Sequence, residues 1–184
     1  PITVGTGATL RLLAAALDAH AVAEIGTGTG TSAAWMLSAM APDAVLTSID
    51  IEGEYQAIAR QALALDDVKS PQVRLITGRA LKVLPRLAAN AYDLVFVDGD
   101  PDESADYLLE ALRILRPGGI VALDRTLWHD RVPDPARRDR ATVQMRELVR
   151  AMRDEPGVIS ALLPCGDGLL AAVKTASSLP PAAH

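Results

Sequence analysis

The sequence predicts an α/β domain in which a mostly parallel sheet is covered by helices on both faces. Between residues 10 and 123, five short apolar segments alternate with segments whose apolar residues recur at helical spacing. This alternation is typical of βαβ units, whose strands are parallel and buried on both sides. Two more short apolar segments close the chain, and the short glycine-containing link between them predicts an antiparallel hairpin at one end of the sheet.

The first five strands are short and apolar, and most of them are followed directly by an acid or a glycine. They are expected at Ala21–Ile25, Ala44–Ile49, Val73–Ile76, Tyr92–Val97 and Ile120–Leu123. The helices that precede and separate them are expected at Leu10–Asp18, Thr31–Met40, Glu54–Leu65, Ala80–Ala89 and Tyr107–Leu115. Pro42 and Pro117 close the second and the fifth helix, because proline cannot donate the helical hydrogen bond.

The pattern changes after Asp124. A loop with two prolines at residues 132–135 leads to a helix at Ala141–Arg153, and the hairpin strands follow at Val158–Leu163 and Leu169–Val173. Neither a repeat nor a linker interrupts the chain, so residues 1–175 are expected to form a single domain. Residues 176–184 continue no such pattern and are expected to be a disordered tail.

Composition excludes several classes of function. The 184 residues carry a formal net charge of −5, which argues against a nucleic-acid-binding surface. No apolar run approaches the roughly 20 residues of a membrane span, and the sequence shows no signal-peptide pattern. A single cysteine cannot form an internal disulfide, so an oxidising compartment is not indicated. We therefore expect a cytoplasmic protein that binds neither nucleic acid nor membrane.

The chemistry is expected just after the strands, because ligands of open α/β sheets bind outside the carboxyl ends of the strands. Gly26, Gly28 and Gly30 follow the first strand and allow a ligand to approach the backbone closely. A dinucleotide fingerprint would place its third glycine at position 31, which is a threonine here. Asp50 ends the second strand, where a carboxylate accepts hydrogen bonds from ribose hydroxyls, although it suits either class of nucleotide cofactor.

Taken together, these segments resemble the class I S-adenosylmethionine-dependent O-methyltransferases, in particular the small catechol and caffeoyl-CoA O-methyltransferase-like family. The resemblance rests on residues 24–32, Asp50, residues 78–80, 92–100 and 115–119, and the closing strand at 168–174. It implies a Rossmann-like fold with a seven-stranded sheet, S-adenosylmethionine as cofactor, S-adenosylhomocysteine as product, and a homodimer. Members of the family usually have further N-terminal helices over the active site, which are expected to be absent or cut short here.

The resemblance assigns residues to the methionine end of the cofactor. Glu24, Gly26 and Thr27 would line it, and Ser32 would hold its carboxylate at the first turn of the following helix, where amides and dipole favour an anion. Ile2 matches a position that contacts the cofactor, on a short stretch of alignment.

The nucleoside end follows in the same way. Asp50 would bind the ribose hydroxyls, with Ile51 against the adenine. Residues 78–80 would meet the adenine edge, with Arg79 at the centre of this Gly78–Ala80 segment and the Ala80 amide as donor. Asp98 would lie beside the amino group and the sulfonium.

The departures from the family pattern concern catalysis. The family places a lysine three residues after Asp98, where this chain has Pro101. The family's metal ligands are two aspartates and an asparagine; Asp98 and Asp124 match the aspartates, but Arg125 replaces the asparagine. A guanidinium competes with a divalent cation for two carboxylates, so we expect Arg125 to take the charge role of the metal. The metal site itself stays unassigned.

Asp98, Asp124 and His129 are the candidate bases for an acceptor hydroxyl, since an imidazole suits proton transfer near neutrality. The alternative is that His129 is an ordinary exposed loop residue. The expected function is methyl transfer to the hydroxyl of a small molecule, without a divalent metal. Two alternatives are a nicotinamide-dependent oxidoreductase and a non-catalytic protein that binds S-adenosylmethionine.

Overall fold

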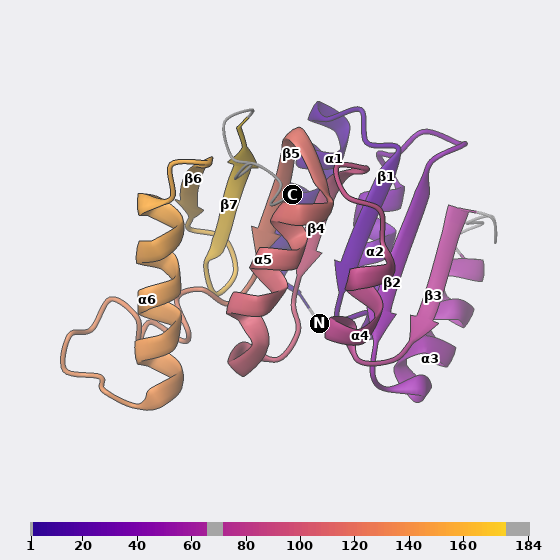
Figure 1. The fold of residues 1–184 in the computed structure, drawn as a ribbon. Helices are drawn as coiled ribbons and strands as arrows, with labels where there is room; N and C mark the ends of the chain where they lie inside the picture. The colour runs from indigo at the N-terminus through magenta and orange to yellow at the C-terminus, as the bar shows by residue number, and fades with distance from the viewer. Residues whose placement is uncertain (1, 66–71, 176–184) are drawn as a thin grey trace.

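The computed structural model describes residues 2–65 and 72–175, and its seven strands form one sheet in the order β3-β2-β1-β4-β5-β7-β6 (Figure 1). The strands are β1 (Ala21–Ile25), β2 (Val45–Asp50), β3 (Val73–Thr77), β4 (Tyr92–Val97), β5 (Leu115–Leu123), β6 (Val158–Leu163) and β7 (Leu169–Lys174). The first five are parallel, and β7 pairs antiparallel with both β5 and β6. The predicted fold class and the edge hairpin are confirmed.

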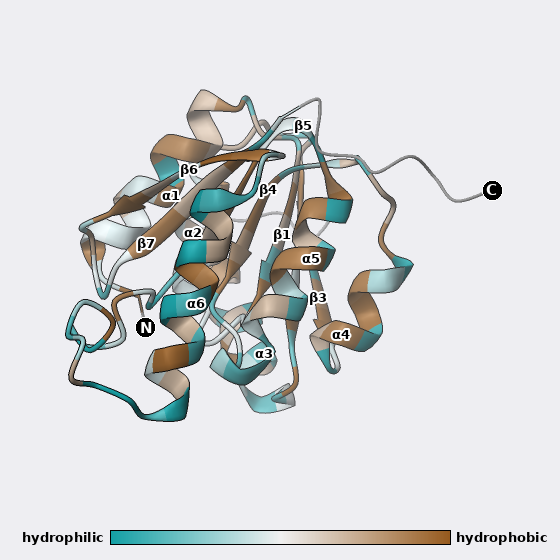
Figure 2. Ribbon diagram, turned by 60° about the vertical axis from the view of Figure 1, so that its left-hand side comes forward, coloured by the Kyte–Doolittle hydropathy of each residue, from teal (hydrophilic) through white to brown (hydrophobic). Residues whose placement is uncertain are grey.

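Helices cover both faces of this sheet (Figure 1). They are α1 (Val4–Ala16), α2 (Thr31–Leu37), α3 (Gly53–Leu65), α4 (Ala80–Val83), α5 (Ser104–Ile114) and α6 (Arg140–Asp154). Figure 2 shows the hydrophobic strands enclosed between helices that turn hydrophilic residues outwards. Strand β4 contributes side chains to the core on both faces of the sheet. Leu94 and Phe96 pack with α1 and α2, whereas Val95 and Val97 pack with α5, because successive side chains of a strand point to opposite faces.

The first helix starts earlier than the sequence predicts. Helix α1 begins at Val4, and the Thr3 hydroxyl caps it by accepting a hydrogen bond from the Thr6 amide at 3.2 Å. The glycines at its start disfavour a helix by intrinsic propensity, but Gly7 packs so closely on Trp35 that a Cβ there would lie 2.4 Å from the indole ring. Tertiary packing therefore outweighs propensity at this end.

Several other boundaries differ from prediction, among them the start of α5 at Ser104 instead of Tyr107. Helix α2 ends at Leu37 instead of Met40. The helix expected at Ala80–Ala89 is only α4 followed by a 3₁₀ turn, η2 (Leu84–Arg86), because Pro85 cannot continue an α-helix. Strand β5 begins at Leu115 and runs through Pro117, with a register shift against β4 between Tyr92 and Leu94. Of β5, only Ile120–Leu123 pair with β7, so Pro117 interrupts no ladder on that side.

None of the helices in the described part of the chain is long and apolar enough to cross a membrane. The tail predicted at 176–184 lies outside the described residues.

Candidate functional site

Two adjoining cavities open at the carboxyl ends of the parallel strands, the edge at which the sequence places the chemistry. The first has a volume of about 590 Å³ and extends from the glycine loop to Asp124 and His129. The second, of about 330 Å³, lies between Ile51 and Tyr107. Both are lined by Gly26, Asp50 and Asp98, so these residues form the ridge between them. The hollow therefore suits an elongated ligand bent over the end of β1.

The loop after β1 has a conformation that favours glycine at three positions, and Asp50 stabilises it. Gly26, Gly28 and Gly30 have φ angles of 92°, 49° and 85°, which are left-handed conformations that favour glycine. A Cβ at Gly26 would lie 2.3 Å from the Asp98 carbonyl oxygen, whereas one at Gly28 would meet no atom within 4 Å. Asp50 fixes the loop by accepting a hydrogen bond from the Gly28 amide at 3.0 Å and another from the Glu52 amide at 2.9 Å.

Glu24 lies beneath this loop and faces neither cavity. Its side chain is fully buried, and its carboxylate accepts hydrogen bonds from the hydroxyls of Ser32 and of Ser48, the latter at 2.5 Å. Thr27 joins the network through Ser48 at 2.6 Å and through the Gln56 amide at 3.0 Å. Burial raises the pKa of Glu24 to about 7. Glu24 thus supports the cavity through Ser32 and Thr27, which do line it.

Asp98 and Arg125 form an ion pair across the ends of β4 and β5. The Arg125 Nη2 atom is 2.7 Å from Asp98 Oδ1 and donates its hydrogen bond to the Gly99 carbonyl oxygen at 2.9 Å. Burial raises the pKa of Asp98, and the charge of Arg125 opposes that shift. The guanidinium therefore neutralises Asp98 from close range.

Asp124 has no counter-ion of this kind. Its residue is 7% exposed, and its Oδ1 atom is buried without a hydrogen-bond partner. Burial, reinforced by the neighbouring charge of Asp98, raises its pKa to about 6. Thr126 Oγ1 and Asp167 Oδ2 are also buried without a hydrogen-bond partner. Of these residues, Asp124 and Asp167 line the first cavity, where a ligand with donors would be bound.

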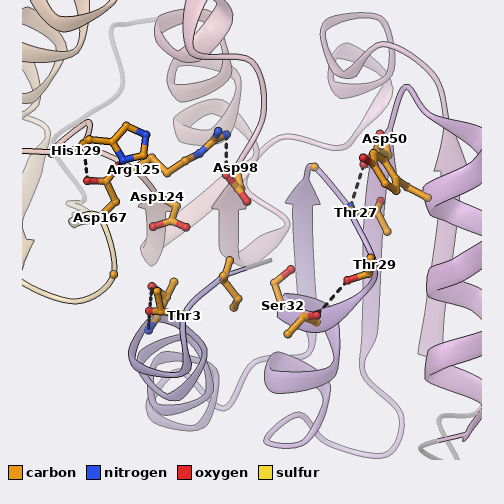
Figure 3. A pocket seen from close by; sticks show the side chains of 17 residues that line it. Thr3, Thr27, Thr29, Ser32, Asp50, Asp98, Asp124, Arg125, His129 and Asp167 are labelled. Atoms are coloured by element: carbon orange, nitrogen blue, oxygen red, sulfur yellow. Dashed lines mark hydrogen bonds and ion pairs between the residues drawn. The ribbon is translucent and has the colours of Figure 1, made fainter.

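His129 stands at the rim, in a strained loop. Arg125, Trp128, His129 and Asp130 all have φ angles between 50° and 59°, a region that non-glycine residues rarely adopt and that clusters at functional sites. Asp167, in the β6–β7 turn, accepts a hydrogen bond from the His129 amide at 2.7 Å, and its Oδ2 atom is 3.6 Å from His129 Nδ1 (Figure 3). The His129 side chain is 74% exposed.

The second cavity has a polar outer wall. Arg79 donates to Glu103 at 2.7 Å, and the Tyr107 hydroxyl donates to the other Glu103 oxygen at 2.6 Å. These two hydrogen bonds lower the pKa of Glu103. Apolar residues Ile25, Ile49 and Ile51, together with Gly78 and Ala80, form the other walls.

The structure therefore brings the candidate residues to one edge of the sheet, in two groups. Lining the first cavity are Ile2, Gly26, Thr27, Ser32, Asp50, Asp98, Asp124, Arg125 and His129. Lining the second are Ile51, Gly78, Arg79 and Ala80. Figure 3 shows Asp124, Arg125 and His129 at one end of the first cavity and Thr27 and Asp50 at the other. Glu24 alone lies behind the cavity wall.

Sequence reasoning missed Asp167 and Glu103. Asp167 reaches the site from the hairpin turn, and nothing local signals that this turn folds back on the loop after β5. Glu103 reads as an acid at a helix start, yet it lines the second cavity. Lys174, by contrast, is buried at the opposite edge, where it donates to Asn90 Oδ1 and to the Leu115 carbonyl oxygen, so it cannot replace the lysine absent at Pro101.

Comparison with known proteins gives a consistent result. The model of a family described as O-methyltransferase matches residues 1–175. A protein of Mycobacterium avium (strain 104), provisionally named an O-methyltransferase, is 47% identical over 173 residues, which are 94% of this chain and 78% of the relative.

Solved structures agree. The O-methyltransferase TomG from Streptomyces achromogenes, involved in tomaymycin synthesis and crystallised in complex with SAM, is 30% identical with a TM-score of 0.86; the match covers 95% of this chain and 82% of TomG. An O-methyltransferase from Bacillus cereus in complex with SAH has the same fold, with 24% identity, a TM-score of 0.86, and 95% and 83% of the two chains covered.

Proposed function

The chain belongs to the O-methyltransferase family, and from that premise we propose how its residues bind S-adenosylmethionine and move the methyl group to a small hydroxylated acceptor. The observation that carries the proposal is the bent hollow at the strand ends, with a left-handed glycine loop and Asp50 at its centre. TomG, which is 30% identical to this chain, was crystallised with this cofactor. The family favours this function over a nicotinamide oxidoreductase.

The cofactor fits the donor and acceptor set of the hollow. Asp50 faces both cavities, and its carboxylate suits the two ribose hydroxyls. Ile51 and the Gly78–Ala80 segment would take the adenine, and Ser32 and the amides at the start of α2 the methionine carboxylate. We call Gly26–Gly30, Ser32 and Asp50 the cofactor end, and Asp124, Asp167 and the loop at residues 125–139 the acceptor end.

When bound, S-adenosylmethionine supplies a methyl group on a positively charged sulfur. The chain's own part in the reaction is to hold the acceptor hydroxyl in line with that group and to take its proton, and positioning alone can supply much of the rate. Of the three candidate bases, Asp98 is engaged by Arg125, which leaves Asp124 and His129 to receive the proton.

The residues do not fit a divalent metal. Asp98 and Asp124 stand where the metal-dependent members have ligands, but the guanidinium of Arg125 is 2.7 Å from the Asp98 carboxylate and a cation between the two acids would lie against it. Within residues 2–65 and 72–175, no three or more His, Cys, Asp or Glu side chains are grouped to hold a metal ion. We infer that Arg125 supplies the positive charge that a metal supplies elsewhere.

The test pairs Arg125→Asn with Arg131→Asn, a nearby exposed arginine of the same loop. Transfer of a labelled methyl group to catechol by the wild-type protein is expected to be unchanged by EDTA. Arg125→Asn is expected to bind Mn²⁺ in a calorimetric titration, whereas the wild-type protein and Arg131→Asn are not. A wild-type rate that falls in EDTA and returns with Mg²⁺ would contradict the assignment.

A homodimer in the cytoplasm and a small-molecule acceptor complete the proposal. The edge strand β6 supports the dimer, because Ile159 and Leu162 expose apolar side chains on it. Light scattering on the purified protein would give twice the chain mass if the dimer forms. Net charge of −5 supports an acceptor other than nucleic acid.

A further inference from the structure

The outer wall of the second cavity offers acceptors and few donors to whatever lies inside it. Asp50, Asp98, Asp100 and Glu103 contribute four carboxylates to the lining, against the single basic side chain of Arg79. Arg79 Nη2 and the Tyr107 hydroxyl both donate to Glu103. A ligand that fills this cavity is therefore complementary to it when it presents N–H and O–H groups towards these carboxylates.

Among these acids, Glu103 is held in position by two hydrogen bonds and can still accept one from a ligand. Its two oxygens each accept one hydrogen bond, from Arg79 and from Tyr107, whereas a carboxylate has about four lone-pair sites. The same two hydrogen bonds keep the group ionised near neutral pH, since they lower its pKa. Asp100, in contrast, accepts the Asp102 amide as the cap of the short helix η3 (Pro101–Glu103).

The position of Glu103 is fixed by packing. The Tyr107 ring lies against Gly99, where a Cβ would come within 2.7 Å of it. Arg79 precedes α4, so its ion pair with Glu103 ties the segment that would meet the adenine edge to the start of α5. The carboxylate is thus held by two hydrogen bonds in the lining of the cavity that also contains Ala80.

We propose that the Glu103 carboxylate, positioned by Arg79 and Tyr107, accepts a hydrogen bond from the exocyclic amino group of the cofactor's adenine and so makes this chain select adenosyl over inosyl ligands. The inference rests on the proposed function, since it requires the second cavity to hold the cofactor's base. In an inosyl ligand the amino group is replaced by a carbonyl oxygen, which would face the carboxylate with no proton between them. A site built to accept a substrate N–H discriminates strongly against an analogue that lacks it.

The test compares S-adenosylhomocysteine with S-inosylhomocysteine by calorimetric titration. Wild-type protein is expected to bind the adenosyl compound at least tenfold more tightly. In Glu103→Gln the amide can donate to the inosyl oxygen, so the ratio of the two dissociation constants is expected to fall below about threefold. Glu110→Gln is the matched control: Glu110 lies on α5, pairs with Arg113 at 2.8 Å and is 24% exposed against 23% for Glu103, but it does not line the cavity. Its ratio should equal that of the wild type.

Each outcome decides the matter. A purely structural role for Glu103 would weaken both ligands by the same factor and leave the ratio unchanged in Glu103→Gln, which would overturn the inference. Equal binding of both compounds by the wild-type protein overturns it without any variant, and leaves the proposed function intact. If neither compound binds, the proposed cofactor site fails and the inference with it. Arg79→Ala, which releases Glu103 without removing it, is expected to give an intermediate ratio.

Discussion

The cofactor end and the acceptor end of the hollow share one sheet edge but are built in different ways. At the cofactor end, glycines adopt the left-handed conformations, and the Asp50 carboxylate has hydrogen-bond partners, as does Glu24 beneath the loop. At the acceptor end, non-glycine residues adopt those conformations, and buried oxygens of Asp124, Thr126 and Asp167 have no hydrogen-bond partner. A site that is satisfied before the ligand arrives is pre-organised, whereas one with unpaired acceptors is completed by its ligand.

The largest effect on stability is expected from a substitution at Gly26, at the cofactor end. Gly26→Ala is expected to lower the free energy of unfolding by about 3 kcal/mol or more, because its Cβ would lie 2.3 Å from the Asp98 carbonyl oxygen. Gly28→Ala, two residues on, meets no atom within 4 Å and is expected to cost only about 1 kcal/mol for its left-handed φ. Urea unfolding of both variants measures the difference, and equal losses would show that the loop is not held against β4.

The buried Glu24 makes stability depend on pH. Its folded pKa of about 7 lies above the ordinary value of 4.5, so the folded state binds the proton more tightly. The stabilising contribution of this group is therefore fully present below pH 4.5 and is lost as the pH rises through 7, by on the order of 3 kcal/mol. Glu24→Gln should remove most of that dependence in urea unfolding at pH 5 and pH 8. An unchanged pH dependence in the variant would assign it to other groups.

Asp50 is expected to matter for binding more than for folding. Asp50→Ala removes the charged acceptor for the ribose hydroxyls and frees the Gly28 amide, so the dissociation constant of S-adenosylmethionine should rise about a hundredfold. Glu52→Ala, an exposed neighbour, is the control and should bind as the wild type does. A loss below about threefold for Asp50→Ala would place the ribose elsewhere.

The smallest effect is expected at the acceptor end, where Arg146 of α6 holds the loop. Its guanidinium donates to the carbonyl oxygens of Val132 at 2.9 Å and Asp134 at 2.8 Å. Arg146→Ala should cost about 1 kcal/mol of stability and speed hydrogen exchange in residues 130–138, with cofactor affinity unchanged. Arg150→Ala on the same helix is the control. A loss of cofactor affinity in Arg146→Ala alone would show that the two ends are coupled.

The two ends also differ in how far the sequence predicts them. Strand ends, the glycine loop and Asp50 follow from periodicity and backbone chemistry, and all of them lie where they were expected. Glu24 was expected in the cavity wall but lies behind it, because the hydroxyls of Ser32 and Ser48 bind its carboxylate there. The sequence does not show these contacts. Asp167 and Glu103 were missed, since each reaches the site through contacts between segments distant along the chain. Local pattern places backbones, while the partners of a side chain depend on tertiary packing.

The central claim is that this hollow binds S-adenosylmethionine with Arg125, and not a metal, balancing the charge of Asp98. The most direct test is calorimetric titration of S-adenosylmethionine into the wild-type protein, once with magnesium and once with EDTA. The account predicts saturable binding with the same dissociation constant in both. Binding that appears only with magnesium would contradict the role of Arg125, and no binding in either would contradict the cofactor site itself.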